Sequence, residues 1–64
     1  MTENYEIIGF YRDLGFALDK TEGIYFIYNR STRKMLYRQT DRKSASRKFA
    51  MFVVSYINTE FEEA

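Results

Sequence analysis

The sequence predicts an α+β fold of the order α-β-β-β-α, in which a three-stranded antiparallel sheet carries its helices on one face. Three observations predict it. A C-terminal segment repeats apolar residues at helical spacing, a central segment consists of β-branched and aromatic residues, and an N-terminal segment shows a second helical pattern that stops at a glycine. With 64 residues, the chain is expected to form one small domain over residues 1–64.

The first helix is expected over residues 4–14. Asn4 can cap it, and Leu14-Gly15-Phe16 is typical of a helix end with a left-handed glycine. Its apolar residues follow three-and-four spacing: Ile7, Ile8, Phe10, Tyr11 and Leu14.

Three strands are expected over residues 16–19, 24–28 and 34–39, with turns at 20–23 and 29–33, and a meander is the simplest pairing. The strand at 24–28 is the strongest, and both of its faces are apolar. Either it is a central strand with both faces covered, or one face is left open to a partner.

The long helix is expected over residues 41–61, capped by Thr40, Asp41 or Ser44. One of its faces is apolar: Ala45, Phe49, Phe52, Val53, Tyr56, Ile57 and Phe61. Its charges oppose the helix dipole, because cations occupy its first turns and glutamates its last. An anion bound at the helix start would turn this arrangement into a favourable one.

Positive charge is concentrated in residues 30–48, although the net charge of the chain is only +1. That segment holds eight of the ten cations and a single acid, Asp41. The eight are the candidate nucleic-acid-binding residues: Arg30, Arg33, Lys34, Arg38, Arg42, Lys43, Arg47 and Lys48. The turn at 29–33 and the helix start would supply two cationic points on a rigid scaffold, suited to phosphate backbone but not to base-specific reading. A solvated, purely solubilising role for these charges is the alternative.

Two further surfaces are candidates for contacts. Tyr25, Tyr28 and Tyr37 could stack on bases or contact a partner if their sheet face were open, or they could fill the core. Met51 and Val54 widen the apolar arc of the long helix, so they could form a homodimer seam or a groove for another protein unless the first helix covers them.

The segment Ser46-Arg47-Lys48-Phe49-Ala50 resembles the start of the second helix of double-stranded-RNA-binding domains. The helix ending in Leu14-Gly15-Phe16, followed by a short strand and a turn at Gly23, is similar to the related HicA-type toxins. That family's catalytic His would follow Gly23, where this chain has Ile24-Tyr25-Phe26, so the resemblance implies no ribonuclease. The segment from Gly23 onward, with Thr40-Asp41-Arg42-Lys43-Ser44-Ala45 as its strand-to-helix junction, also resembles the three-strand-plus-helix arm-binding modules of phage integrases.

Composition argues against catalysis and cofactors. The chain has no His and no Cys, and its acids show no spacing that brings two of them together. We therefore expect no enzyme activity, no metal and no cofactor. The acidic start precedes no long apolar run, so a cytoplasmic protein that does not enter the membrane is expected.

The sequence favours a small non-enzymatic module that binds DNA or RNA through phosphate contacts, with a regulatory role. The rival hypothesis is a protein-binding inhibitor or adaptor, such as an accessory protein of a phage or mobile element. Its basic face would dock on an acidic surface of a host protein, or its aromatic strand would join a partner's sheet.

Overall fold

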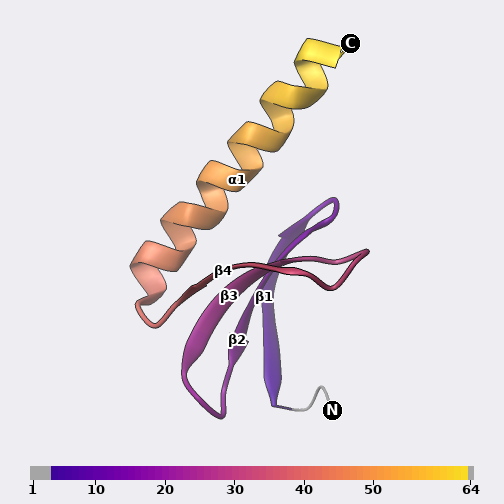
Figure 1. Cartoon of the computed structure of the whole chain (residues 1–64). Helices are drawn as coiled ribbons and strands as arrows, with labels where there is room; N and C mark the ends of the chain where they lie inside the picture. The colour runs from indigo at the N-terminus through magenta and orange to yellow at the C-terminus, as the bar shows by residue number, and fades with distance from the viewer. Residues whose placement is uncertain (1–3, 64) are drawn as a thin grey trace.

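The chain folds as an antiparallel sheet of four strands followed by one helix (Figure 1). This computed structural model describes residues 4–63, and the side chains of residues 60–63 lie outside the description. The strands follow one another as a meander in the order β1-β2-β3-β4. Their bounds are β1 Tyr5–Tyr11, β2 Leu14–Asp19, β3 Ile24–Asn29 and β4 Met35–Gln39, and the helix α1 spans Arg42–Glu63.

The prediction of an N-terminal helix is wrong, and so are the predicted α-β-β-β-α order and the predicted three-stranded sheet. Residues 5–11 form β1, which pairs antiparallel with β2 along its whole length. Asn4 caps no helix; its carbonyl accepts a hydrogen bond from the Lys20 N–H at 2.8 Å. The element order that carried the resemblance to double-stranded-RNA-binding domains and HicA-type toxins is therefore not the one this chain adopts.

A bulge explains why β1 resembles a helix in sequence. The register with β2 shifts between Ile7 and Gly9, so Ile8 and Gly9 both lie opposite Phe16 on the core side and the alternation restarts one residue later. The resulting apolar spacing matches a helical stripe as well as it matches a strand. Gly9, which would weaken a helix, lies at the irregularity without strain.

The glycine at position 15 does not end a helix. It lies inside β2, opposite Phe10 on one side and Tyr28 on the other. The chain reverses two residues earlier, in a tight hairpin where Arg12 takes the left-handed conformation with φ of 52°.

The remaining elements agree with the sequence. Strands were expected at 16–19, 24–28 and 34–39, and β2, β3 and β4 lie there. The turn at 20–23 is closed by Gly23, with φ of 70°, and by Asp19, whose carboxylate accepts the N–H groups of Thr21 and Glu22 at 3.0 and 3.4 Å. The helix expected at 41–61 is α1.

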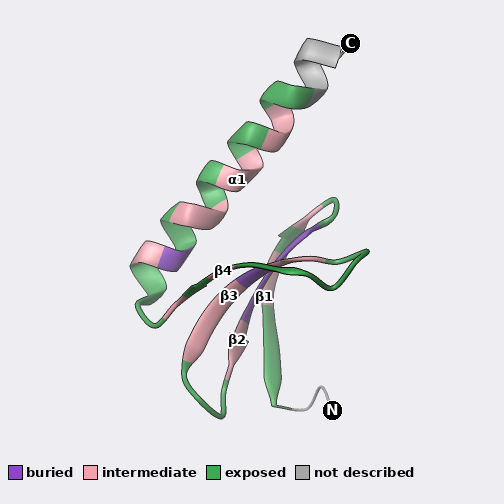
Figure 2. Cartoon of the chain, viewed as in Figure 1, coloured by how far each residue is buried: buried purple, intermediate pink, exposed green. Residues whose placement is uncertain are grey.

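The core lies between α1 and one face of the sheet, as the purple segments of Figure 2 show. Phe16 from β2, Ile27 from β3 and Ala45 from α1 are buried together. Phe49 stacks on Phe16 with ring centroids 5.3 Å apart. The strand at 24–28 is thus central in the sheet, and α1 covers only one of its two faces.

Asp41 is the cap of α1. Its carboxylate accepts the backbone N–H of Ser44 at 2.8 Å, and this bond holds the pKa of Asp41 below its usual value of 3.8. The charges of α1 do not complement the helix dipole, as the sequence predicted, since α1 has no acid in its first turn and no base in its last. Within residues 4–63, no helix has the length and apolar character needed to cross a membrane.

Candidate functional site

The sheet face that α1 leaves uncovered is the candidate site. Alternation along the strands places Phe26 on it, because Phe26 precedes the core residue Ile27 and successive side chains point to opposite faces. Pairing extends this face across the sheet from Ile7 through Ala17 and Phe26 to Arg38. We call this surface the open face.

The open face forms a broad groove with a volume of about 890 Å³. Ala17 is buried, yet it lines this groove with no more than a methyl group, so the larger side chains stand around it. The large apolar and aromatic residues that line it come from β1, β3 and β4: Tyr5, Ile7, Ile24, Phe26, Tyr28 and Met35. The side chain of Ile7 is 61% exposed and that of Met35 is 48% exposed.

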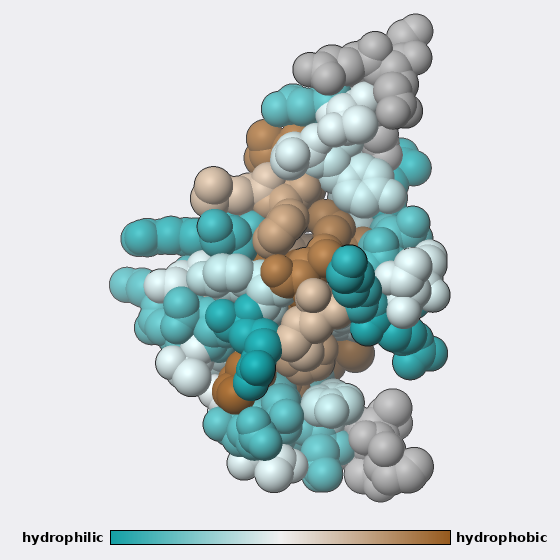
Figure 3. Space-filling model, viewed as in Figure 1, coloured by the Kyte–Doolittle hydropathy of each residue, from teal (hydrophilic) through white to brown (hydrophobic). Residues whose placement is uncertain are grey.

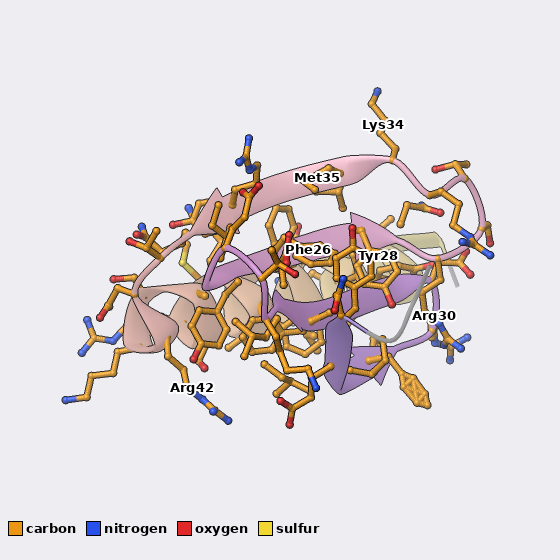
Figure 4. The ribbon with its side chains drawn as sticks, turned by 90° about the horizontal axis from the view of Figure 1, so that it is seen from below. Phe26, Tyr28, Arg30, Lys34, Met35 and Arg42 are labelled. Carbon is orange, nitrogen blue, oxygen red and sulfur yellow. The ribbon has the colours of Figure 1, made fainter. Side chains whose placement is uncertain are left out.

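Three aromatic rings lie in a row within the groove. The Tyr5 ring meets the Phe26 ring edge to face, with centroids 5.7 Å apart. The Phe26 ring meets the Tyr28 ring at 5.5 Å with a tilt of 44°. Such contacts fix the rings of neighbouring side chains relative to one another. The row therefore presents aromatic surface in a defined arrangement, and Figure 4 shows Phe26 and Tyr28 side by side.

Gly15 makes room for the last ring of this row. A Cβ built on Gly15 would overlap the Tyr28 ring and would lie 2.7 Å from the Tyr28 hydroxyl oxygen. Any other residue at position 15 would push that ring away from the sheet. The glycine that the sequence suggested as a helix end thus positions an aromatic side chain on the open face.

Arg30 is held at the end of the groove formed by the β3–β4 loop. One of its guanidinium N–H groups donates to the Arg12 carbonyl at 2.8 Å, and the guanidinium lies 4.2 Å from the centroid of the Phe10 ring. The same loop is tied to the β1–β2 hairpin by the Ser31 hydroxyl, which donates to Asp13 at 3.1 Å. These contacts order a side chain that is otherwise rotamer-rich.

Charge is distributed unevenly along the groove. Arg30 and Arg33 lie at the β3–β4 loop, and Arg38 lies on β4 beside Phe26. Asp19 and Glu22 lie at the other end, in the β2–β3 turn, while Asp13 accompanies Arg30. The loop end and the β4 side of the groove are therefore cationic, and the turn end is acidic.

The eight predicted cations do not share one face. Arg30, Arg33 and Arg38 line the groove, whereas Lys34 projects away from Phe26 and Tyr28 (Figure 4). The other four lie in the first turns of α1, and Figure 4 shows Arg42 at the opposite end of the molecule from Arg30. The four are Arg42, Lys43, Arg47 and Lys48.

The three predicted tyrosines are divided between the two faces. Tyr28 lies in the groove, while Tyr25 and Tyr37 pack against the core on the side of α1. There they receive cations from the helix start: the Arg42 guanidinium lies 5.9 Å from the Tyr25 ring centroid, and the Lys48 ammonium lies 5.3 Å from that of Tyr37. Tyr25 and Tyr37 are thus not available as an open stacking surface.

Phe26 and Tyr5 are the aromatic site residues that the sequence did not predict. The alternation of side chains along a strand could have identified Phe26. It places Ile24, Phe26 and Tyr28 on one sheet face and Tyr25 and Ile27 on the other. Selecting tyrosines by residue type mixed the two faces. Tyr5 could not be found this way, since its strand was expected to be a helix.

Comparison of the chain with protein-family models, with characterised proteins and with solved structures finds no significant match. Any function must therefore be inferred from the geometry of the open face and of the helix.

Proposed function

We propose that this protein binds single-stranded nucleic acid on the open face and catalyses no reaction on it. The observation that carries the proposal is the row of Tyr5, Phe26 and Tyr28 on an uncovered sheet face, beside the groove arginines Arg30, Arg33 and Arg38. Aromatic side chains that stack on bases, combined with cations that follow the backbone, are the common means of binding a single strand.

The position of the aromatic row favours unpaired bases over a duplex. Its rings lie in the groove, where a ligand must present flat aromatic surface to reach them. In a duplex this surface is enclosed within the base stack, and phosphates and groove edges are what a protein meets. A single strand can instead turn its bases toward Phe26 and Tyr28 and its phosphates toward the arginines.

The arginines suggest the path of the backbone. A guanidinium presents several N–H donors in a fixed plane and binds phosphate through two of them. Phosphates would pass along the β4 side of the groove, near Arg38, to the β3–β4 loop, because Asp19 and Glu22 at the other end repel them. The four cations at the start of α1 lie at a separate place, and they would extend the contact only with a longer strand.

The test is a titration of a short labelled oligonucleotide, single-stranded or duplex, followed by fluorescence anisotropy over a series of salt concentrations. We expect the single strand to bind more tightly, with a log–log salt slope of about −2 for three phosphate contacts. A slope near −5 would indicate that the helix start contributes as well. Absence of binding at low salt to DNA and to RNA would refute the proposal.

A matched pair of variants locates the contact. Arg38→Ala is expected to weaken binding and to reduce the slope by about 0.7, because it removes one phosphate contact. Lys20→Ala removes a cation from the β2–β3 turn, outside the groove, and is expected to change neither. Equal effects of the two changes would mean that binding reflects overall charge rather than this groove.

A second candidate function is docking on another protein. The strongly exposed aliphatic Ile7 and Met35 favour it, as do the acids along the same groove, because protein interfaces combine apolar contact area with charges of both signs. If this candidate is right, no oligonucleotide binds at low salt. The wild type instead binds a soluble protein partner, and the Ile7→Lys variant does not.

A further inference from the structure

Among the residues that the structure describes, none packs over the face of α1 that carries Met51 and Val54, which is a second uncovered surface. Met51 is 62% exposed and Val54 is 54% exposed, while Phe49 and Phe52 on the other side of the helix pack against the core. The sequence allowed an N-terminal helix to cover this surface, but that segment is β1, which pairs with β2. Figure 3 shows hydrophobic residues continuing along α1 beyond its junction with the sheet.

The exposed positions of α1 form a stripe with the spacing of a helix–helix seam. They recur every three or four residues along one side of the helix, with apolar residues in the middle and polar or charged residues toward both ends. We call them the helix stripe: Lys43, Arg47, Ala50, Met51, Val54 and Asn58.

The apolar middle of the stripe lies at the centre of the helix. Met51 is nine residues after the first residue of α1, and Val54 is nine residues before the last. A twofold axis passing between them would place Met51 of one copy against Val54 of the other, twice over. It would also overlay the two helices along their full length, which at 1.5 Å per residue is about 33 Å. Isologous contacts of this kind are the commonest in homo-oligomers.

The charges of α1 select the direction of such a pair. The helix begins with Arg42, Lys43, Arg47 and Lys48 and ends with Glu60, Glu62 and Glu63. Within one chain this order opposes the helix dipole at both ends. In an antiparallel pair, the cationic start of each helix lies beside the acidic end of its partner, and the two dipoles are also opposed. A parallel pair would instead place like charges together.

We propose that the protein forms a homodimer in which the two copies of α1 pack antiparallel through the helix stripe. The second copy is the occupant that both the central apolar residues and the complementary ends fit. The dimer leaves both open faces uncovered, on the outer sides of the assembly, because α1 lies between the stripe and the sheet. It also accounts for a charge order that is unfavourable in an isolated helix.

The first test is the mass in solution by sedimentation equilibrium over a wide range of protein concentration. We expect twice the chain mass of 7.7 kDa at high concentration for the wild type. Met51→Lys combined with Val54→Lys should give the monomer mass with unchanged circular dichroism, because both side chains are exposed. The control, Thr59→Lys, adds a cation at an exposed position of α1 outside the stripe and should remain dimeric.

The second test determines the direction of the pair. The chain contains no Cys, so single cysteines report cross-links cleanly. Arg47→Cys and Asn58→Cys, mixed and oxidised, should form the mixed disulfide in preference to either symmetric one, since these positions oppose each other only in the antiparallel pair.

Three results would overturn the proposal. One is a wild type that stays monomeric at every concentration, and another is a preference for symmetric disulfides. The third is a dimer that survives the double substitution in the stripe but dissociates with Ile7→Lys. The last result would place the contact on the open face, and it would count against the proposed nucleic-acid site as well.

Discussion

The two faces of the sheet have similar hydrophobic content but different surroundings. On the helix side, Phe16 and Ile27 are almost completely buried. On the open face, Ile7 is 61% exposed although it is as apolar as Ile27, and the aromatic Tyr5 is 46% exposed. A chain of this size gains most of its stability from the covered face. Apolar and aromatic side chains on the other face are more than folding alone requires, which is typical of a binding surface.

Adjacent residues of β3 show this difference most sharply, and substitutions there give the largest expected effect. Ile27→Ala should destabilise the fold by about 2–5 kcal/mol, because it leaves a cavity among Phe16, Ala45 and Ile27's other core neighbours. A small domain has only a few kcal/mol to lose, so this variant should be largely unfolded. Urea titration followed by circular dichroism measures the change.

Phe26→Ala is the matched variant one residue away. It should cost about 1 kcal/mol, since the ring is only half-buried and loses mainly its contacts with Tyr5 and Tyr28. If Phe26→Ala destabilised the protein as much as Ile27→Ala, the open face would be part of the core and the comparison would fail.

The second effect concerns binding. Phe26→Ala should weaken the affinity for a single strand by about five- to 150-fold, corresponding to the roughly 1–3 kcal/mol of one stacked base. Phe26→Tyr keeps the ring and should bind nearly as well as the wild type. Anisotropy titrations at one fixed salt concentration provide the comparison, and equal affinities for the alanine and tyrosine variants would contradict base stacking.

A smaller effect is expected from Gly15→Ala. The added methyl group displaces the Tyr28 ring, so affinity should fall about fivefold, near the lower end of the roughly 1–3 kcal/mol per stacked base. The same change made in a Tyr28→Ala background should have no effect on affinity, because no ring remains to be displaced. An equal loss in both backgrounds would show that Gly15 acts on the strand and not on the tyrosine.

The smallest effect concerns Asp41, which caps α1, the helix that covers one face of the sheet. Because hydrogen bonds from Ser44 lower the pKa of Asp41 in the fold, its contribution to stability is present above about pH 4 and disappears as the pH falls through the lowered pKa. Asp41→Ala should lower the melting temperature at neutral pH. Asp41→Asn, an equally good cap, should keep most of the stability at neutral pH while reducing its loss on acidification. Identical pH profiles for the wild type and Asp41→Asn would contradict this role.

The fold was predictable wherever the spacing of apolar residues matched either a helix or a strand but not both. β3 is continuous in β-branched and aromatic residues, and α1 repeats its apolar residues over several turns, so both were expected at nearly their observed bounds. The segment 5–11 failed because the bulge between Ile7 and Gly9 breaks the period-two alternation. The apolar spacing left in this segment resembles one face of a helix, and only its pairing with β2 distinguishes a strand from a helix here.

The site was only partly predictable for a related reason. The cations and Tyr28 were recognisable from residue type, and the separation of the turn cations from those at the helix start was expected. Which strand residues line the groove depends on the sheet face that each position occupies. The seat of the Tyr28 ring on Gly15 is a contact across two strands, and no local pattern reveals it. Similarly, Met51 and Val54 are exposed because the segment predicted to form a covering helix is β1.

The most direct test of the central claim is a methyl NMR titration of the protein with a single-stranded oligonucleotide. Isoleucine and methionine methyl groups report the two faces separately: Ile7, Ile24 and Met35 line the groove, whereas Ile8 and Ile27 belong to the helix side. The account predicts shifts of the groove methyls with little change at Ile8 and Ile27. Shifts confined to the residues of α1, or none at all, would contradict it.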